Sequence, residues 1–348
     1  MTIDVPAVFD EQAGACGRLG SPFMEQLMHL IGHHLTPGTP VGARVFGWQQ
    51  DPSAQASALA LRLAGALHAV RLGGDPGLAA VYPPNRVRDE TLWAAVANAL
   101  DAHADTLLDW LKSAPQTNEV RRAAVVVPVL HALEKEHGLP LSVSELGCSA
   151  GLNLRADQFC LKAGDVTLGD PGSPVVLQPE WRGQLPVAGD PQVASRQGVD
   201  LNPLDPEEDA LRILAYIWPD QPERVARTQA ATDIAKRTPA RVDRGDAIAW
   251  LERELSQPRE GYTHLIFHTI AWQYFPPEVQ ARGEAVLAAA GARATPSTPL
   301  ARLSMEPDGA SASVRLTCWP GGATREIARA DYHARWVEWF GTKEATDG

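Results

Sequence analysis

The chain has few cysteines and no long hydrophobic run, and both shortages exclude classes of protein. Four cysteines in 348 residues, none of them in a C-x-x-C pair, exclude a small disulfide-stapled fold. No apolar stretch approaches the ~20 residues that a membrane-spanning helix needs. The acidic start MTIDVPAVFDEQ lacks the basic and apolar regions of a secretory signal. We therefore expect a cytoplasmic protein with reduced thiols.

Positive charge and metal-ligand patterns are also scarce. The chain holds 31 Lys and Arg against 42 Asp and Glu, for a net charge of −11, whereas binding to nucleic-acid backbones requires clustered Lys and Arg. His33 and His34 are adjacent in the sequence. His264 and His268 fall in an apolar run that favours a strand, where they would lie ~13 Å apart. We expect no nucleic acid, no membrane and no metal as partners.

The first third of the chain has the apolar spacing of amphipathic helices. Hydrophobic residues are 45% and charged residues 21% of the chain, as in globular proteins. Apolar residues recur three and four positions apart over 21–35 and 88–111. A helix over 51–70 would be capped by Asp51, and a buried helix over 118–138 would be kinked at Pro128 and end at Gly138.

After residue 140 the pattern changes to short apolar runs that alternate with helical stretches. This alternation is typical of a mostly parallel α/β sheet, here a Rossmann-like one. We therefore predict an N-terminal helical domain over 1–114 and an α/β domain over 115–348, with an inserted Gly/Pro-rich segment around 162–195. The predicted strands cover 141–146, 196–201, 240–246, 264–270, 300–306, 313–319 and 324–330.

The run LSVSELGCSAGLNL, residues 141–154, carries the main functional signal. A strand that ends in glycines and leads into a helix exposes main-chain N–H groups where open α/β sheets bind nucleotides. A dinucleotide fold requires G-x-G-x-x-G, but a serine stands at the position of the middle glycine. The pattern E-x-G-x-x-x-G instead resembles motif I of class I S-adenosylmethionine-dependent methyltransferases. The resemblance implies cofactor contacts from Glu145, Gly147, Ser149, Gly151 and Asn153.

Two acids stand at the ends of the next two predicted strands. Asp200 is placed to accept both ribose hydroxyls of a cofactor, and Asp246 to accept the adenine amino group, with the N–H of Ala247 beside it. The alternative for each acid is a cap on the following helix. The inserted segment must explain why Asp200 comes so late in the chain. If Asp200 does not hold the ribose, Asp165 or Asp170 in the insertion is the alternative.

The fourth predicted strand and the loop after it lie in THLIFHTIAWQYFPPE. In methyltransferases of this class the loop after this strand faces the methyl group. The predicted catalytic residues are His268 as a general base, Gln273 as an orienting amide and Tyr274. Trp272 is predicted to contact the substrate. No Asn or Asp occupies this loop, which argues against methylation of nucleobase amino groups. The alternatives are that His268 is a satisfied core histidine and that the aromatic residues only pack.

Asn118 and Glu119 in QTNEV either cap the buried helix or contact the substrate as part of a lid. With them, much of the chain resembles a bacterial family known only as domain-of-unknown-function family 2332, which is predicted to have a methyltransferase-like fold. The stretches that carry this resemblance include VYPP, QTNEVRRAAVVVP, ELGCSAGLNL, GVDLNPLD, WPDQPERVARTQAA, WQYFP, SMEP and CWPGG.

The resemblance implies an S-adenosylmethionine-dependent methyltransferase that acts on a small molecule. The alternative is a protein that keeps the fold but binds no methyl donor, and serves as a partner-binding module or carries out unrelated chemistry. A nicotinamide-dependent oxidoreductase is a third reading, disfavoured by the missing middle glycine.

Overall fold

The computed structural model describes residues 4–54, 56–186 and 188–342. The chain divides into two compact units, each with its own core. One unit, mainly helical, comprises Met1–Thr117 and Glu208–Ala226, and the other, α/β unit comprises Asn118–Glu207 and Arg227–Gly348. The helical unit thus takes a second piece of chain that lies between predicted strands.

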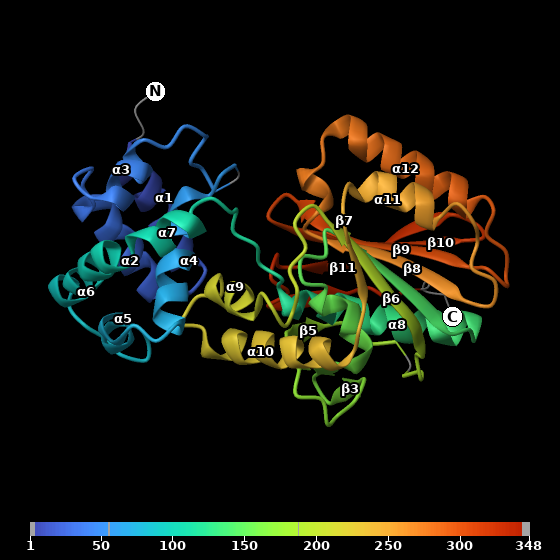
Figure 1. Cartoon of the computed structure of the whole chain (residues 1–348). Helices are drawn as coiled ribbons and strands as arrows, with labels where there is room; N and C mark the ends of the chain where they lie inside the picture. Colours follow the sequence, from blue (N-terminus) through green and yellow to red (C-terminus); the bar gives the residue numbers. More distant parts are fainter. Residues whose placement is uncertain (1–3, 55, 187, 343–348) are drawn as a thin grey trace. The chain divides into compact units, whose positions relative to one another are not determined.

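The helical unit is built from short amphipathic helices (Figure 1). Ser21 caps α2 by accepting a hydrogen bond from the N–H of Met24, with Pro22 at the first helical position. Leu27 and Ile31 on the same helix are fully buried, as their spacing predicts. The helices are α1 (Val5–Arg18), α2 (Pro22–His34), α3 (Pro40–Phe46), α4 (Leu59–Leu72), α5 (Pro76–Val81), α6 (Asp89–Ala102), α7 (Ala104–Trp110) and α9 (Ala210–Ala215).

Two helix predictions in this unit are wrong at their boundaries. The helix expected from Asp51 begins only at Leu59, because the Asp51 carboxylate accepts from the N–H of Ser53 and closes a turn instead. The helix expected over 88–111 breaks at His103, which separates α6 from α7 and bonds to Asp75 at 2.9 Å. The side chain of Asp51 thus competes with the helix for a main-chain N–H, and the bond of His103 to Asp75 accompanies the break between α6 and α7.

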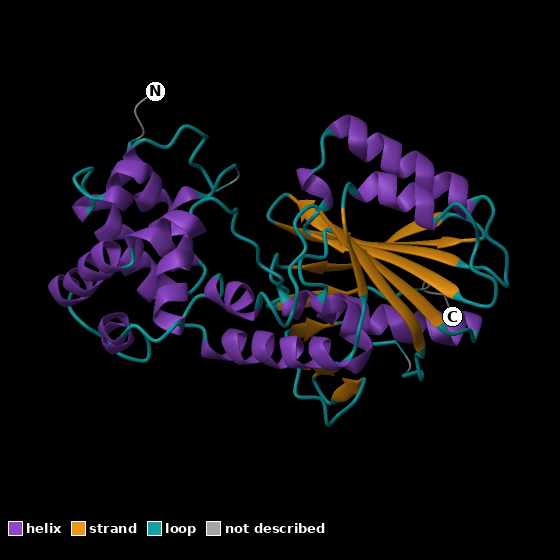
Figure 2. Cartoon of the chain, in the orientation of Figure 1, coloured by secondary structure: helices purple, strands orange, loops and turns teal. Residues whose placement is uncertain are grey.

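In the part of the chain that the structure describes, nine strands form one sheet in the order β5-β12-β11-β10-β9-β8-β1-β6-β7. Figure 2 shows the strands of the α/β unit in orange with helices packed around them. The pairs among β7, β6, β1, β8 and β9 are parallel, and β9 to β12 pair antiparallel. A mixed α/β fold with a large, mostly parallel sheet is confirmed. The strands are β1 (Leu141–Leu146), β5 (Glu180–Arg182), β6 (Val193–Asp200), β7 (Arg241–Arg244), β8 (Thr263–Thr269), β9 (Leu300–Asp308), β10 (Ser311–Trp319), β11 (Ala323–Ala330) and β12 (Trp336–Trp339).

Helices cover both faces of this sheet. The helices α11 (Ala247–Glu254) and α12 (Pro277–Gly291) lie on one face, and α8 (Ala123–His137) lies on the other (Figure 1). Pro128 lies inside α8, and the left-handed Gly138 ends it as predicted. The helix α10 (Pro222–Arg237) contains the boundary between the units. None of the described helices is long and apolar enough to cross a membrane, and each of the four cysteines is free.

The predicted helix after the glycine loop is absent, and a 3-10 segment, η2 (Leu152–Gln158), takes its place. Arg155 departs from helical geometry there, with φ of −103°. Its guanidinium donates to the carbonyls of Gly151 and Thr238, and the N–H of Leu152 donates to the Asn118 side chain. The Asn118 side chain therefore satisfies a first-turn N–H that a helix leaves unpaired, and Arg155 ties the segment to the distant Thr238 carbonyl.

The inserted segment forms a separate three-stranded sheet of β2 (Cys160–Ala163), β3 (Val166–Leu168) and β4 (Val176–Leu177). The strands β2 and β3 pair antiparallel as a hairpin. The remainder of the insertion adds β5 to the edge of the large sheet, where it pairs with β12.

The direction in which the chain crosses the large sheet reverses between β1 and β8. From β1 the chain moves outward through β6 to β7, and then returns to continue from β8 to β9 on the other side. Open α/β sheets bind ligands at such a reversal, outside the carboxyl ends of the strands. This position is the starting point for the candidate site.

The packing of the insertion is testable at two glycines. A Cβ on Gly169, whose φ is 81°, would lie 2.1 Å from the Phe159 carbonyl oxygen, whereas nothing lies within 4 Å of a Cβ on Gly164, whose φ is 59°. We expect Gly164→Ala to lower the free energy of unfolding by about 1 to 2 kcal/mol for its left-handed backbone. Gly169→Ala should cost about 2 to 5 kcal/mol, because the clash adds to that strain. Equal losses in urea unfolding would contradict this packing.

Candidate functional site

Glu145, near the carboxyl end of β1, is a buried acid with one unpaired oxygen. The residue is 2% exposed, and its Oε2 has no hydrogen-bond partner among the described residues. Burial raises the pKa of Glu145 well above its ordinary value, with Arg155 lowering it and Asp200 raising it further. The carboxyl is therefore held in its neutral form under conditions in which an exposed glutamate is ionised.

The loop after β1 has a strained backbone. Gly147, Ser149 and Gly151 all have positive φ, of 67°, 52° and 64°. A Cβ on Gly147 would lie 2.7 Å from the Cβ of Ala271, so only glycine fits where this loop meets the loop after β8. Ile270 in that second loop also has a positive φ, of 54°, which is rare for a β-branched residue. Strain of this kind concentrates at functional sites.

Asp200 joins the end of β6 to the loop after β1. Its Oδ2 accepts from the N–H of Ser149 and its Oδ1 from the N–H of Asn202, both at 2.8 Å. No helix begins directly after it in the described chain, because α9 starts at Ala210, so Asp200 is not a helix cap. Each carboxylate oxygen can accept further hydrogen bonds, such as those from ribose hydroxyls.

The other acids considered from the sequence take structural positions. Asp246 is exposed and caps α11, accepting from the N–H groups of Ile248 and Ala249, while Ala247 is buried in the first turn. Asp170 closes a turn by accepting from the N–H of Gly172, and Asp165 lies in the turn between β2 and β3. Asp246 is therefore a helix cap, as the alternative interpretation predicted. It also lies just beyond the carboxyl end of β7.

Asn118 and Glu119 lie against the glycine loop. The Oδ1 of Asn118 accepts from the N–H of Leu152 at 2.9 Å, and the side-chain amide of Asn153 donates to the Glu119 carbonyl at 3.2 Å. Glu119 also caps the 3-10 turn η1 (Val120–Arg122). Asn118, Glu119 and Asn153 are all buried. Residues 118 and 119 therefore cap η1 and also hold the end of the glycine loop and the start of η2 in place.

We call Glu145, Ser149, Asn153 and Asp200 the β1-loop cluster. Glu145 Oε2, Ser149 Oγ and Asn153 Oδ1 are buried, and none has a hydrogen-bond partner among the described residues. Folded proteins pair most of their buried polar atoms, because leaving one unpaired costs about 1–3 kcal/mol. Three unpaired oxygens in one short segment at the strand-order reversal indicate a binding site for a ligand that donates hydrogen bonds.

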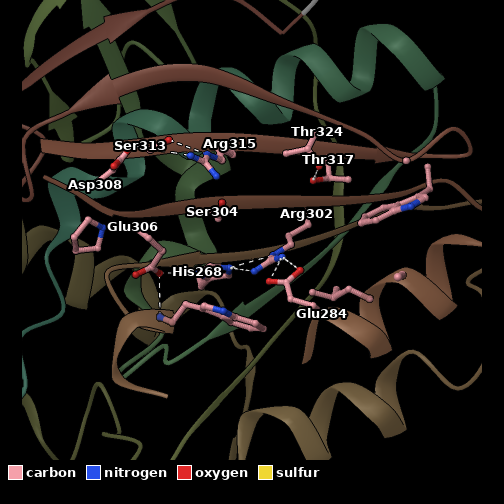
Figure 3. Close-up of a pocket in the computed structure, with 16 residues that line it drawn as sticks. His268, Glu284, Arg302, Ser304, Glu306, Asp308, Ser313, Arg315, Thr317 and Thr324 are labelled. Carbon is pink, nitrogen blue, oxygen red and sulfur yellow. Dashed lines mark hydrogen bonds and ion pairs between the residues drawn. The ribbon is translucent and has the colours of Figure 1, made fainter. Parts of the chain in front are cut away.

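A second feature is a polar groove of about 640 Å³ on the sheet face beside α12 (Figure 3). Side chains alternate across a strand, so every second residue of β9 and β10 points into it. The outward-facing positions of these two strands are polar, while their neighbours Leu303 and Val314 are buried. The polar residues from β9 and β10 that line the groove are Arg302, Ser304, Glu306, Asp308, Ser313, Arg315 and Thr317.

His268 and its neighbours form a hydrogen-bonded chain at the wall of the groove (Figure 3). Nδ1 of His268 donates to Glu306 at 2.7 Å, and its Nε2 accepts from Arg302 at 3.1 Å. Arg302 in turn makes two hydrogen bonds to Glu284, at 2.6 and 2.7 Å. Burial lowers the pKa of His268 despite the opposing effect of Glu306. The imidazole is therefore neutral, with both nitrogens engaged.

The predicted catalytic loop is held mainly by Glu306. Its Oε1 accepts from the N–H groups of Ala271 and Trp272 at 3.1 and 3.0 Å, and its Oε2 from that of Gln273 at 3.4 Å. Burial raises the pKa of Glu306, but the hydrogen bond from His268 outweighs this and holds that pKa below its ordinary value. Glu306 is thus an ionised residue that positions the loop after β8.

The aromatic residues of this loop are placed differently from one another. Trp272 is 7% exposed, stacks on His268, and has the Arg302 guanidinium 4.5 Å from its ring centre. Tyr274 is 69% exposed, and the Gln273 side chain is exposed beside it. His268 is therefore a satisfied buried histidine, Trp272 packs against it at the lining of the groove, and Gln273 and Tyr274 are accessible.

Sequence reasoning missed Arg155, Arg302 and Glu306. Arg302, Ser304 and Glu306 alternate with apolar residues along one strand, a pattern that predicts a polar sheet face. This pattern could have pointed to Arg302 and Glu306. Arg155 gave no such signal, because its partners are main-chain carbonyls, one of them at Thr238 far along the chain.

Comparison with known proteins identifies the family. A family model described as "Uncharacterized protein conserved in bacteria (DUF2332)" matches residues 7–339, so the chain belongs to this family. Neither the search of curated proteins nor the search of solved structures found a match. The family description names no reaction, and the function must be argued from the site.

The neutral state of Glu145 predicts a pH-dependent stability. Because its folded pKa lies above its unfolded pKa, its contribution is fully present below the unfolded value and is lost as the pH rises through the folded value. Relative to Glu145→Gln, the parent should lose about 1.4 kcal/mol per pH unit within that interval. Urea unfolding between about pH 5 and pH 9 measures this. A constant difference would contradict it, and exposed Glu278→Gln controls for the loss of a carboxylate.

Proposed function

We propose that this DUF2332 protein binds S-adenosylmethionine at the β1-loop cluster and transfers its methyl group to a small polar molecule. The observation that carries the proposal is the buried, partnerless oxygen of Glu145 at the strand-order reversal. A cationic amino group beside it would ionise the carboxyl and pair with it, which would offset the cost of burying the acid.

The arrangement of acids along the sheet supports this cofactor. The strands β1, β6 and β7 are neighbours, and Glu145, Asp200 and Asp246 stand at or just beyond their carboxyl ends. In a Rossmann-like methyltransferase these positions would serve the amino acid portion, the ribose hydroxyls and the adenine amino group. The buried Oδ1 of Asn153 would add a further acceptor, and Leu201, 67% exposed after Asp200, offers apolar surface to the adenine ring.

Methyl transfer from S-adenosylmethionine requires little acid–base catalysis by the protein. Bound S-adenosylmethionine supplies an activated methyl group on a sulfonium, so the chain has mainly to align the acceptor with it. Glu306 would do this indirectly by fixing the loop at Ala271 and Trp272. His268 could serve as a base only if Arg302 released its Nε2. Gln273 and Tyr274 are the accessible side chains for contacting an acceptor.

The groove supports a small polar acceptor. Its volume of about 640 Å³ lies within the ~300–1,000 Å³ of small-molecule sites. Its charged side chains are of both signs, so it favours neither a polyanion nor a polycation. Trp272 and Glu306 belong both to its lining and to the contacts that hold the loop after β8.

The four free thiols suit a reducing compartment such as the cytoplasm.

The 3-10 segment η2 favours a second candidate, in which the fold is retained without a methyl donor. Class I methyltransferases continue from the glycine loop into an α-helix, whereas here Arg155 and Asn118 occupy main-chain groups of this segment. The same feature weighs against a nicotinamide dinucleotide, whose pyrophosphate would require the N-terminus of an α-helix. A binding measurement separates these candidates.

The first test of the proposed cofactor is calorimetry with S-adenosylhomocysteine on the parent and on Asp200→Asn. The substitution keeps the side-chain shape but removes its charge, so it should weaken binding by about 1.5 to 3 kcal/mol. The matched control is Asp205→Asn in the same loop, because Asp205 is exposed and accepts from the N–H of Glu207. This control should bind like the parent.

Two outcomes would contradict the assignment. If the parent binds neither S-adenosylhomocysteine nor S-adenosylmethionine at millimolar concentration, the methyl-donor function is wrong and the second candidate stands. If Asp200→Asn binds as the parent does, the cofactor is retained but its ribose is held elsewhere. Unfolding curves of both variants show whether the Ser149 contact to Asp200 is lost as well.

A further test uses the proton on Glu145. A ligand amino group that pairs with this carboxyl should drive off its proton, so binding below the folded pKa should release up to one proton and strengthen as the pH rises. Calorimetry in two buffers with different ionisation enthalpies measures the release. Glu145→Gln should bind more weakly and release none. A binding enthalpy for the parent that does not depend on the buffer would place the amino group away from Glu145.

A further inference from the structure

We infer that Asp10, His29 and His33 form a binding site for a divalent first-row transition-metal ion in the helical unit. His29 and His33 are spaced i, i+4 on α2, and Asp10 comes from α1. One ligand atom from each residue lies within 4.8 Å of the other two. The histidine pairs considered from the sequence were His33 with His34 and the two histidines of β8, and this cluster was missed because Asp10 is distant along the chain from the two histidines of α2.

The three side chains converge on one point. Nδ1 of His29 lies 2.7 Å from Asp10 Oδ1, and Nε2 of His33 lies 3.1 Å from both Asp10 oxygens. Residues four apart on a helix share a face, so α2 presents both imidazoles to the same carboxylate. An ion at this point would replace the protons that now link the three groups, with small side-chain rotations.

The donor set selects the class of ion. Two imidazole nitrogens with one carboxylate suit Zn²⁺, Ni²⁺, Co²⁺ and Cu²⁺, whereas Mg²⁺ and Ca²⁺ prefer sites made of oxygen alone. The side chains of His29, His33 and Asp10 are 49%, 55% and 39% exposed. Water can therefore complete the coordination shell, as in three-ligand sites that keep open positions and unlike closed structural zinc sites.

The position of the site also predicts its effect on the fold. The helices α1 and α2 pack together, with Phe9 and Leu27 among their fully buried residues. An ion held by both helices binds only when they are packed, so it stabilises the folded helical unit by an amount that rises with the ion concentration relative to its dissociation constant. The site is independent of the β1-loop cluster, because its ligands belong to the other unit.

The test is calorimetric titration of the untagged, chelator-treated full chain with Zn²⁺, together with the visible absorption of the Co²⁺ form. We expect one ion per chain, a micromolar dissociation constant and a raised thermal midpoint, with no response to Mg²⁺. His29→Ala and His33→Ala should each weaken Zn²⁺ binding by at least about tenfold. The matched control is His34→Ala, because His34 stacks on Trp93 instead of joining the cluster.

Circular dichroism of the metal-free variants checks that each is folded. The inference is overturned if the parent binds no Zn²⁺ at submillimolar concentration. It is equally overturned if folded His29→Ala and His33→Ala bind as tightly as the parent, or if His34→Ala weakens binding as much as they do. Asp10→Asn, which keeps the side-chain size, should give the intermediate loss expected of a weaker oxygen ligand.

Discussion

The interior position of the Glu145 carboxyl is the constraint around which the α/β unit is organised. A buried acid with an unpaired oxygen is costly, and the chain tolerates it at the point where the strand order reverses. The positive-φ loop, the bond from Ser149 to Asp200 and the buried Arg155 all hold the backbone around it. The unpaired buried oxygen lowers the stability of the free protein. A ligand that paired with it would restore that stability.

The loop after β8 is fixed by a second, complementary set of interactions. An ionised Glu306 gathers three main-chain N–H groups and the proton of His268, and Arg302 closes the other side of the imidazole. The histidine, on β8, is consequently held in place as part of the wall of the groove. A protein that relies on alignment more than on proton transfer can use such a wall, because small displacements of the reacting groups lower the rate steeply.

Local sequence patterns predicted most of the fold but only part of the candidate site. All seven strands expected from apolar runs are present within a few residues, as is the turn from Gly138 that ends α8. The acids at the strand ends were recognisable because they follow those runs directly. Arg155 and Glu306 were not, because their partners lie on other elements and no local pattern reports such contacts.

The sequence by itself determined the seven main strands, most of the helices and many of the side chains that face a core, because those choices depend on neighbours within a few residues. The tertiary structure alone decided the strand order, the replacement of a helix by η2, and the neutral state of His268. It also brought Asp10 to the two histidines of α2. Each of these depends on the burial of a group or on a contact between residues far apart in the chain, which local propensities do not encode.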